Sequence, residues 1–324
     1  MDEAELKKPT LHVDLPVWGD AKELLAKMVS CLEAEQAAGN TPLFKESSWV
    51  ERCQEWKAKY PVVQKKHYED TKHTNVYAFI KELSSRLSEG QVTVVGNGSA
   101  CVVGSHAYVI KKGQRFIINS AIASMGYDLP AAIGAVVAEH GNLALNREAL
   151  KHDDIKDVIL VTGDGSIQMN IQELQTIRQN RLPVKLFVIN NQGYHSIRQT
   201  QTNLFGNHTK IGIGPESGDL SFPSYEKLAV AFGYPYYAAH SNAEMKMAVE
   251  NTLKEEGAVF CEIFVSPEQF FEPKSATKRL PDGSLFSPPL EDLAPFLPEE
   301  ELQGNMFIPC ITKKRYLGKN YMEI

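Results

Sequence analysis

The chain has 324 residues, of which 43% are hydrophobic and 23% are charged, a composition that fits a soluble globular protein of roughly two domains. This composition excludes disordered and fibrous classes. Its 34 basic and 40 acidic residues give a net charge of −6, so we expect no nucleic-acid or membrane partner. The five scattered cysteines form no C-x-x-C pair, and neither a signal peptide nor an apolar run of spanning length is found, which predicts a cytoplasmic protein.

The N-terminal part of the chain predicts two helices separated by a linker. Residues 11–15 alternate between apolar and polar side chains, which predicts a short strand, and Asp20 is placed to cap a helix with one apolar face. One strand and one helix cannot enclose a core, so we interpret this segment as the remnant of a larger domain. Residues 33–46 predict the linker, and aromatic residues at helical spacing predict a helix over 49–60 that Pro61 ends.

A regular alternation of helices and strands follows from residue 74 to residue 265. The predicted strands are 92–95, 115–118, 158–162, 184–189 and 259–265, and the predicted helices are 76–87, 129–139, 171–180, 225–232 and 243–254. The strands are continuous runs rich in Val and Ile, which is typical of parallel strands that are buried on both faces. The sequence therefore predicts an α/β fold, a doubly wound and mostly parallel sheet with helices on both faces.

These patterns divide the chain into three parts. We interpret residues 1–45 as the remnant of a middle domain with its linker, residues 46–266 as the main α/β domain, and residues 267–324 as a C-terminal arm. The arm is rich in proline and acidic residues, which predicts an irregular segment that wraps the surface of the domain. Its basic cluster at residues 313–315 is interpreted as a solvated tail.

Polar, glycine-containing segments follow two predicted strands that are connected by one helix. Gly163-Asp164-Gly165-Ser166 follows the first strand, and Asn190-Asn191-Gln192-Gly193 follows the second. Because ligands bind beyond the carboxyl ends of the strands in doubly wound sheets, we expect both segments to face one crevice. The Asp164 carboxylate, the Asn191 amide oxygen and the Gly193 carbonyl offer three oxygen ligands. Two phosphate oxygens and a water would complete the near-octahedral shell of Mg²⁺.

Each segment alone has a simpler interpretation. Gly-Asp-Gly-Ser after a strand also fits a tight turn, and an Asn-Asn pair fits a turn or a helix cap. Their joint occurrence around one strand–helix–strand unit favours the interpretation as a metal–phosphate site. A dinucleotide fingerprint does not fit, because the G-x-G-x-x-G spacing is not met, and a P-loop does not fit, because no Gly-Lys-Ser/Thr ends the loop. A flavodoxin-like or nicotinamide-binding fold with a coincidental motif is a further alternative.

The two segments together resemble the thiamine diphosphate (ThDP) and Mg²⁺ motif of ThDP-dependent enzymes. Several segments are similar to the acetohydroxyacid (acetolactate) synthase branch of that family: 125–134, which reads Met-Gly-Tyr-Asp-Leu-Pro-Ala-Ala-Ile-Gly, then 163–174, and 13–16 with Gly19 and Asp20. The resemblance covers most of residues 11–265. It implies the ThDP-binding fold for the main domain, which corresponds to the diphosphate-binding, C-terminal half of the family chain.

The resemblance also implies roles for individual residues. Asp164, Asn191 and the Gly193 carbonyl are the implied metal ligands, and Met125 is the implied catalytic residue, since a bulky apolar side chain at its position props the bent cofactor. The implied cofactor-binding residues are Asn97, Gly98, Ser99, Met125, Gly163, Asp164, Gly165, Ser166, Asn191, Gly193 and Tyr194. Residues 194–201 correspond to a segment on the substrate side. There, His195 and Arg198 have two open interpretations, contact with a carboxylate or oxyanion, and a simple surface role.

The implied reaction is the decarboxylation of a 2-keto acid such as pyruvate, followed by transfer of the two-carbon unit to an acceptor carbonyl. In the family, a pyrimidine-binding domain supplies a glutamate that activates the cofactor, and no residue of this sequence matches it. We therefore expect a partner chain that carries this domain, in a dimer or a higher oligomer, and no activity without the partner. The alternatives are that this chain is a fragment of a longer one, and that it is a non-catalytic ThDP- and Mg²⁺-binding subunit.

The sequence departs from the family pattern in three respects. Most of the middle domain, which carries FAD in many family members, is absent, so we do not expect FAD. Thr200 stands where the synthases of branched-chain amino-acid synthesis usually have Trp, and Asp128 replaces a Gly. These changes predict a different acceptor, for which a keto-sugar nucleotide is a candidate.

Overall fold

The computed structural model describes residues 2–8, 12–40, 48–140, 156–206, 210–279 and 283–307. By internal contacts the chain divides into two compact units, Met1–Pro61 and Val62–Ile324. The domain bounds at residues 45 and 266 stay a prediction beside this division. Leu11, residues 41–46 of the predicted linker and the basic cluster at 313–315 lie outside the described residues.

The first unit contains the helices α1, Ala21–Ala37, and α2, Ser48–Lys59. The Asp20 side chain accepts hydrogen bonds from the backbone N–H groups of Lys22 and Glu23, which confirms the predicted cap. The predicted strand at 11–15 is wrong, because residues 12–15 form no strand and no neighbouring strand in the described part of this unit offers a ladder of hydrogen bonds. The linker also begins later than predicted, since α1 continues through Ala37.

The second unit is built around a sheet of six parallel strands. These are β1, Val92–Val95; β2, Arg115–Ile118; β3, Val158–Gly163; β4, Val184–Asn190; β5, Tyr236–Ala239; and β6, Val259–Phe264. Their order is β2-β1-β3-β4-β6-β5, and every neighbouring pair is parallel, which confirms the predicted α/β fold. The strand β5 is not predicted from the sequence, because Tyr-Tyr-Ala-Ala at the edge of the sheet lacks the β-branched run of the central strands.

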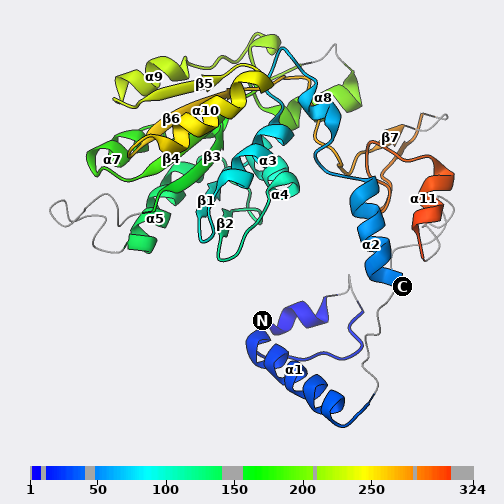
Figure 1. Cartoon of the computed structure of the whole chain (residues 1–324). Helices are drawn as coiled ribbons and strands as arrows, with labels where there is room; N and C mark the ends of the chain where they lie inside the picture. The colour runs from blue at the N-terminus through cyan, green and yellow to red at the C-terminus, as the bar shows by residue number, and fades with distance from the viewer. Residues whose placement is uncertain are drawn as a thin grey trace. The chain divides into compact units, whose positions relative to one another are not determined.

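Helices cover both faces of this sheet (Figure 1). On one face lie α3, Val76–Arg86; α4, Ser99–Ala107; and α10, Asn242–Lys254; on the other lie α5, Asp128–His140; α7, Glu173–Gln179; and α9, Tyr225–Ala231. Alternate residues of each central strand enter the two cores, so that Ile159 packs with the first set of helices and Leu160 with the second. Burial on both faces explains why the strands read as continuous apolar runs.

Three further α-helices and a hairpin complete the α-helices and strands of the described residues. These are α6, Asp164–Ile167; α8, His195–Phe205; α11, Glu299–Asn305; and the antiparallel pair β7, Lys278–Arg279, with β8, Leu285–Phe286. The arm predicted as irregular therefore contains a small hairpin and a helix. Its first part is anchored to the second unit, since Phe271 is buried and Glu272 accepts a hydrogen bond from Nε2 of His67 at 3.0 Å.

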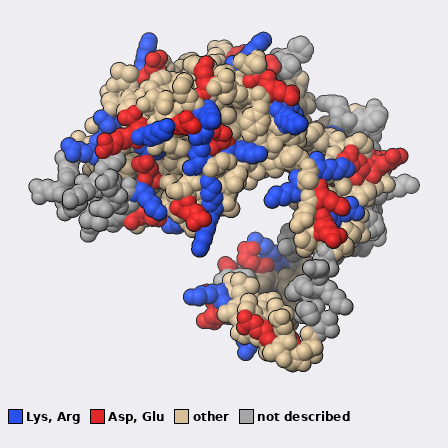
Figure 2. Space-filling model, viewed as in Figure 1, with Lys and Arg blue, Asp and Glu red and all other residues tan. Residues whose placement is uncertain are grey.

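The surface of the second unit carries both signs of charge. Figure 2 shows Lys and Arg side chains intermixed with Asp and Glu side chains over the visible face. Among the described residues, no helix combines the length and the apolar character that a membrane crossing requires.

Candidate functional site

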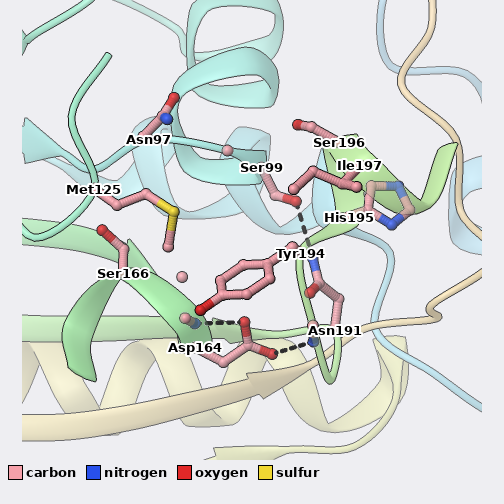
Figure 3. Close-up of a pocket in the computed structure, with 14 residues that line it drawn as sticks. Asn97, Ser99, Met125, Asp164, Ser166, Asn191, Tyr194, His195, Ser196 and Ile197 are labelled. Carbon is pink, nitrogen blue, oxygen red and sulfur yellow. Dashed lines mark hydrogen bonds between the residues drawn. The ribbon is translucent and has the colours of Figure 1, made fainter. Parts of the chain in front are cut away.

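A pocket of about 240 Å³ lies where the chain reverses direction across the sheet (Figure 3). From β1 the chain passes to β2 on one side, and β3 then lies on the other side of β1. Such reversals leave a crevice at the carboxyl ends of the strands, where doubly wound folds bind ligands. The pocket is lined by all the predicted cofactor-binding residues: Asn97, Gly98, Ser99, Met125, Gly163, Asp164, Gly165, Ser166, Asn191, Gly193 and Tyr194. The structure brings these residues together, and their individual roles stay predictions.

Asp164 follows β3 directly and is almost fully buried. Its Oδ1 accepts a hydrogen bond from the Gly165 N–H at 2.7 Å, and its Oδ2 accepts one from the Gly193 N–H at 3.0 Å. Burial raises the pKa of this carboxyl to about 7, although the backbone donors and the Arg198 charge lower it in part. A divalent cation beside the carboxyl would favour its ionised form, so the electrostatics of this residue suit a metal ligand.

Asn191 lies at the same end of the pocket as Asp164 (Figure 3). Its Nδ2 donates a hydrogen bond to the Ser99 hydroxyl at 3.0 Å, which orients the amide. Its Oδ1 is buried and accepts no hydrogen bond from the described residues. Because a buried carbonyl oxygen without a partner is unfavourable, this atom fits the position of a metal ligand.

Two glycines of the pocket stand where no side chain fits. A Cβ atom at Gly193 would overlap the Ile213 carbonyl oxygen and would lie 2.6 Å from Nη2 of Arg198. At Gly165 a Cβ atom would overlap the Tyr194 ring and would lie 3.3 Å from Cε of Met125. The side chains of Tyr194 and Met125 therefore both lie beside Gly165, where they form an apolar wall next to a bare stretch of backbone.

The loop that carries Met125 is held by residues of the Gly-Asp-Gly-Ser region. The Gly126 N–H donates to the Ser166 hydroxyl at 2.9 Å, and Nδ2 of Asn170 donates to the Gly126 carbonyl at 2.6 Å. Gly126 has a φ of +79°, and a Cβ atom there would lie 2.7 Å from Cβ of Met169. These contacts fix the backbone next to Met125, so the side chain predicted to prop the cofactor projects from a rigid support.

Asp128, which replaces a glycine of the family pattern, is buried behind the pocket and does not line it. Its Oδ2 accepts a hydrogen bond from the Thr162 hydroxyl, and its Oδ1 accepts none from the described residues. Burial raises the pKa of this carboxyl. The other departure, Thr200, is exposed on α8, where its hydroxyl donates to the Ser196 carbonyl at 3.0 Å. Neither residue contacts the pocket directly.

His195 and Arg198 lie on the first turn of α8, and both are buried, so a surface role is wrong for both. His195 lines the pocket wall and packs edge-on against Phe271, with ring centroids 4.9 Å apart. Burial and the Arg198 charge lower the pKa of His195 to about 4, so its ring is neutral at pH 7. Arg198 does not line the pocket, because its guanidinium donates to the carbonyls of Asn191 and Gln192.

Three residues around the pocket are absent from the predicted site residues, although two of them, Ser196 and Ile197, belong to the segment 194–201 that the resemblance assigns to the substrate side. Ser196 and Ile197 line it beside His195, and the Tyr225 hydroxyl donates to the Asp164 carbonyl at 2.5 Å. The polar, β-branched segment His-Ser-Ile-Arg-Gln-Thr-Gln gives no clear helical periodicity, and α8 is therefore not predicted. No sequence signal places Tyr225 near Asp164, since the two residues come together only through the packing of α9 on the sheet.

Comparison with known families and proteins agrees with this site. Residues 96–263 match the family model "Thiamine pyrophosphate enzyme, C-terminal TPP binding domain", in which thiamine pyrophosphate (TPP) is another name for ThDP. The matched range begins just after β1 and ends within β6. It includes all the predicted site residues.

Three relatives are acetolactate synthases. The large subunit of Porphyra purpurea is 28% identical over 298 residues, which cover 83% of this chain and 43% of that protein. The isozyme 3 large subunit of Escherichia coli (strain K12) is 32% identical over 227 residues, covering 69% of this chain and 35% of that protein. Acetolactate synthase 1, chloroplastic, of Zea mays is 27% identical over 296 residues, covering 88% of this chain and 41% of that protein.

The chain thus spans about two fifths of the length of the curated relatives it matches. The match to the family model covers more than half of the chain and includes every residue that lines the pocket. The chain belongs to the thiamine pyrophosphate enzyme family, whose C-terminal TPP-binding domain it carries.

Proposed function

We propose that this chain is the diphosphate-binding half of a ThDP- and Mg²⁺-dependent enzyme related to acetolactate synthase. The proposed reaction decarboxylates a 2-keto acid such as pyruvate and transfers the two-carbon unit to an acceptor carbonyl. One observation carries the proposal: the buried Asp164 carboxyl and the unpartnered Asn191 Oδ1 lie at one end of a pocket that also contains the bare backbone of Gly165. The names of the three relatives, each an acetolactate synthase, support the reaction class.

Different residues of the pocket would bind the metal and the diphosphate. Asp164, Asn191 Oδ1 and the Gly193 carbonyl would hold Mg²⁺, whose preference is for oxygen ligands. The pocket also contains Gly98 and Ser99 at the beginning of α4, where the first N–H groups have no partner within the helix and the positive helix end favours phosphate. Met125 and Tyr194 would exclude water from the other side. ThDP, when bound, supplies the carbanion chemistry, and the protein supplies binding and orientation.

We also propose that a pyrimidine-binding domain from a partner chain completes the active site. The support is the match itself, which is to the C-terminal TPP-binding domain of the family and covers about two fifths of the length of the relatives. In this proposal the partner supplies the acid that faces the pyrimidine ring. This chain supplies the metal ligands and the apolar prop Met125.

Calorimetry of the full chain with ThDP and Mg²⁺ tests the cofactor assignment. We expect ThDP to bind to the chain in the presence of Mg²⁺ and not to bind after EDTA has removed the metal. Asp164→Ala removes the one carboxylate among the proposed ligands and is expected to abolish metal-dependent binding. Asp14→Ala is the matched control, because its side chain is 92% exposed and lies in the first unit. Retained binding in Asp164→Ala would contradict the assignment of the metal site.

Consumption of pyruvate tests the reaction and the partner. We expect none with the chain alone, and consumption when a chain with a pyrimidine-binding domain is co-expressed and co-purifies by gel filtration. Binding of ThDP and Mg²⁺ with no consumption in any mixture would favour the non-catalytic binding subunit. Absence of ThDP binding by the wild-type chain would contradict both interpretations.

A further inference from the structure

Arg198 lies directly behind the 191–193 segment, which carries two of the three proposed metal ligands. The residue is 4% exposed and projects from the first turn of α8. Placing a cation in the interior is unfavourable unless hydrogen bonds and an opposite charge compensate for the lost water. Its position is therefore explained by the groups that it contacts.

The guanidinium of Arg198 holds two successive peptide groups of this segment. Nη1 donates to the Asn191 carbonyl at 3.2 Å, and Nη2 donates to the Gln192 carbonyl at 2.9 Å. On its other side, Nε donates to Oε1 of Glu216 at 2.6 Å, an ion pair that fixes the guanidinium plane. The planar fork thus connects the segment to the short 3-10 helix Pro215–Ser217, a geometry that a lysine ammonium does not reproduce.

The backbone of the 191–193 segment has a conformation that needs such support. Gln192 has a φ of 53°, which is left-handed and uncommon for a residue with a side chain. A conformation of this kind costs roughly 1 kcal/mol or more and persists only where the surroundings hold it. Here the Gln192 N–H donates to Oδ1 of Asn190 at 3.0 Å, and the Gly193 N–H donates to Oδ2 of Asp164 at 3.0 Å. The two bonds from Arg198 hold the carbonyl side of the same peptides.

We propose that Arg198 is a positioning residue that holds the 191–193 segment in the conformation required for binding the divalent cation. In this inference Arg198 touches neither the metal nor the cofactor, and it acts through the backbone that places Asn191 and Gly193. Glu216 in turn holds Arg198 in place. The inference rests on the proposed function, because it concerns the same metal site.

Loss of this support would change the preference among metal ions as well as the affinity. Mg²⁺ requires near-ideal octahedral geometry with short bonds, whereas Ca²⁺ accepts irregular shells with longer bonds. A loosened 191–193 segment would therefore weaken the binding of Mg²⁺ more than that of Ca²⁺. A variant that is merely less folded would weaken both ions by the same factor.

The test is calorimetry of the full chain at saturating ThDP, with Mg²⁺ and Ca²⁺ titrated separately. Arg198→Met keeps the length of the side chain and removes the donors, and we expect its Kd for Mg²⁺ to rise about 10- to 100-fold, as for other residues that orient metal ligands. Its Kd for Ca²⁺ is expected to rise less. Arg198→Lys keeps the charge without the fork and is expected to lie between wild type and Arg198→Met. Arg178→Met is the matched control, since Arg178 stacks over the Tyr234 ring at 5.5 Å and does not line the pocket.

An unchanged Kd for Mg²⁺ in Arg198→Met, or an equal loss for both ions, would overturn the inference. If circular dichroism shows that Arg198→Met does not fold, Arg198→Lys decides: a reduced preference for Mg²⁺ over Ca²⁺ supports the role, and an unchanged preference overturns it. Wild-type chain that binds no ThDP with either ion refutes the proposed function itself. Wild-type binding together with an unaffected Arg198 variant refutes the positioning role alone.

Discussion

Asp164 makes the stability of the cofactor-free chain depend on pH, and Asp164→Asn removes that dependence. Burial raises the pKa of the carboxyl from 3.8 to about 7. Because the folded state holds this proton more tightly than the unfolded state, the stability that the group contributes is complete below pH about 4 and is lost as the pH rises through about 7. Each pKa unit corresponds to about 1.4 kcal/mol, so the total is about 4 kcal/mol, of which about 3 kcal/mol falls between pH 5 and pH 8.

The assay is urea unfolding of both proteins between pH 5 and pH 8, followed by far-ultraviolet circular dichroism. Tryptophan fluorescence is unsuitable, because Trp18, Trp49 and Trp56 all lie in the first unit and do not report on the sheet. When the free energy of unfolding of one protein is subtracted from that of the other, the contributions of the titratable groups that both proteins contain cancel. One of these is His195, whose pKa of about 4 makes the folded state more stable as the pH rises from about 4 to about 6.5.

We expect this difference to shift by about 3 kcal/mol in favour of Asp164→Asn between pH 5 and pH 8. The asparagine side chain retains one of the two backbone hydrogen bonds that the carboxylate accepts. Loss of the other bond changes the stability of Asp164→Asn by the same amount at every pH, so it does not affect the predicted shift. Asp14→Asn, at a 92% exposed side chain, is the control for the substitution itself. A difference that stays constant from pH 5 to pH 8 would refute the reasoning, since Asp164 would then titrate alike in the folded and unfolded states.

Three further predictions concern metal binding and the two ends of the pocket. Since ligation needs the ionised Asp164, the affinity for ThDP and Mg²⁺ measured by calorimetry should fall about tenfold from pH 8 to pH 6, and an affinity independent of pH would contradict this role. Gly193→Ala should reduce the free energy of unfolding by more than about 2 kcal/mol and abolish metal binding, because the new Cβ atom would overlap the Ile213 carbonyl oxygen. Gly163→Ala is the control, since a Cβ atom has space there, and it should melt like wild type. Equal melting temperatures for the two variants would show that a side chain is tolerated at Gly193. Ser99→Ala removes the acceptor that orients the Asn191 amide and should weaken Mg²⁺ binding with about 1 kcal/mol lost in stability, and an unchanged Kd for Mg²⁺ would show that the orientation does not matter.

The parts of the fold that the sequence predicts are those in which local pattern and tertiary environment agree. The strand Val158–Gly163 is buried on both faces, and its continuous apolar, β-branched run predicts such a strand. Tyr236–Ala239 forms a strand only because the edge of the sheet accepts it, and its own residues do not indicate that position. The helix Ser99–Ala107 contains glycine, serine and valine, which are weak helix formers, and its packing against the sheet overrides their propensity.

In the candidate site, too, some features are predictable from the sequence and others depend on tertiary packing. The convergence of Asp164 and Asn191 is predictable, because adjacent parallel strands place their carboxyl ends at one edge of the sheet. The direction of the Arg198 side chain is not predictable from spacing, since it depends on the left-handed backbone at Gln192 and on Glu216, which lies in the later 3-10 helix Pro215–Ser217. Contacts of this kind are formed by the folded backbone and leave no periodic signal in the sequence.

A crystal structure of the full chain grown with ThDP and Mg²⁺ would test the central claim most directly. We predict one Mg²⁺ that lies about 2.1 Å from an Asp164 carboxylate oxygen, Asn191 Oδ1 and the Gly193 carbonyl oxygen, with two diphosphate oxygens and a water completing its shell. A metal or a diphosphate bound outside this pocket, or a cation that only one of these oxygens contacts, would contradict the account.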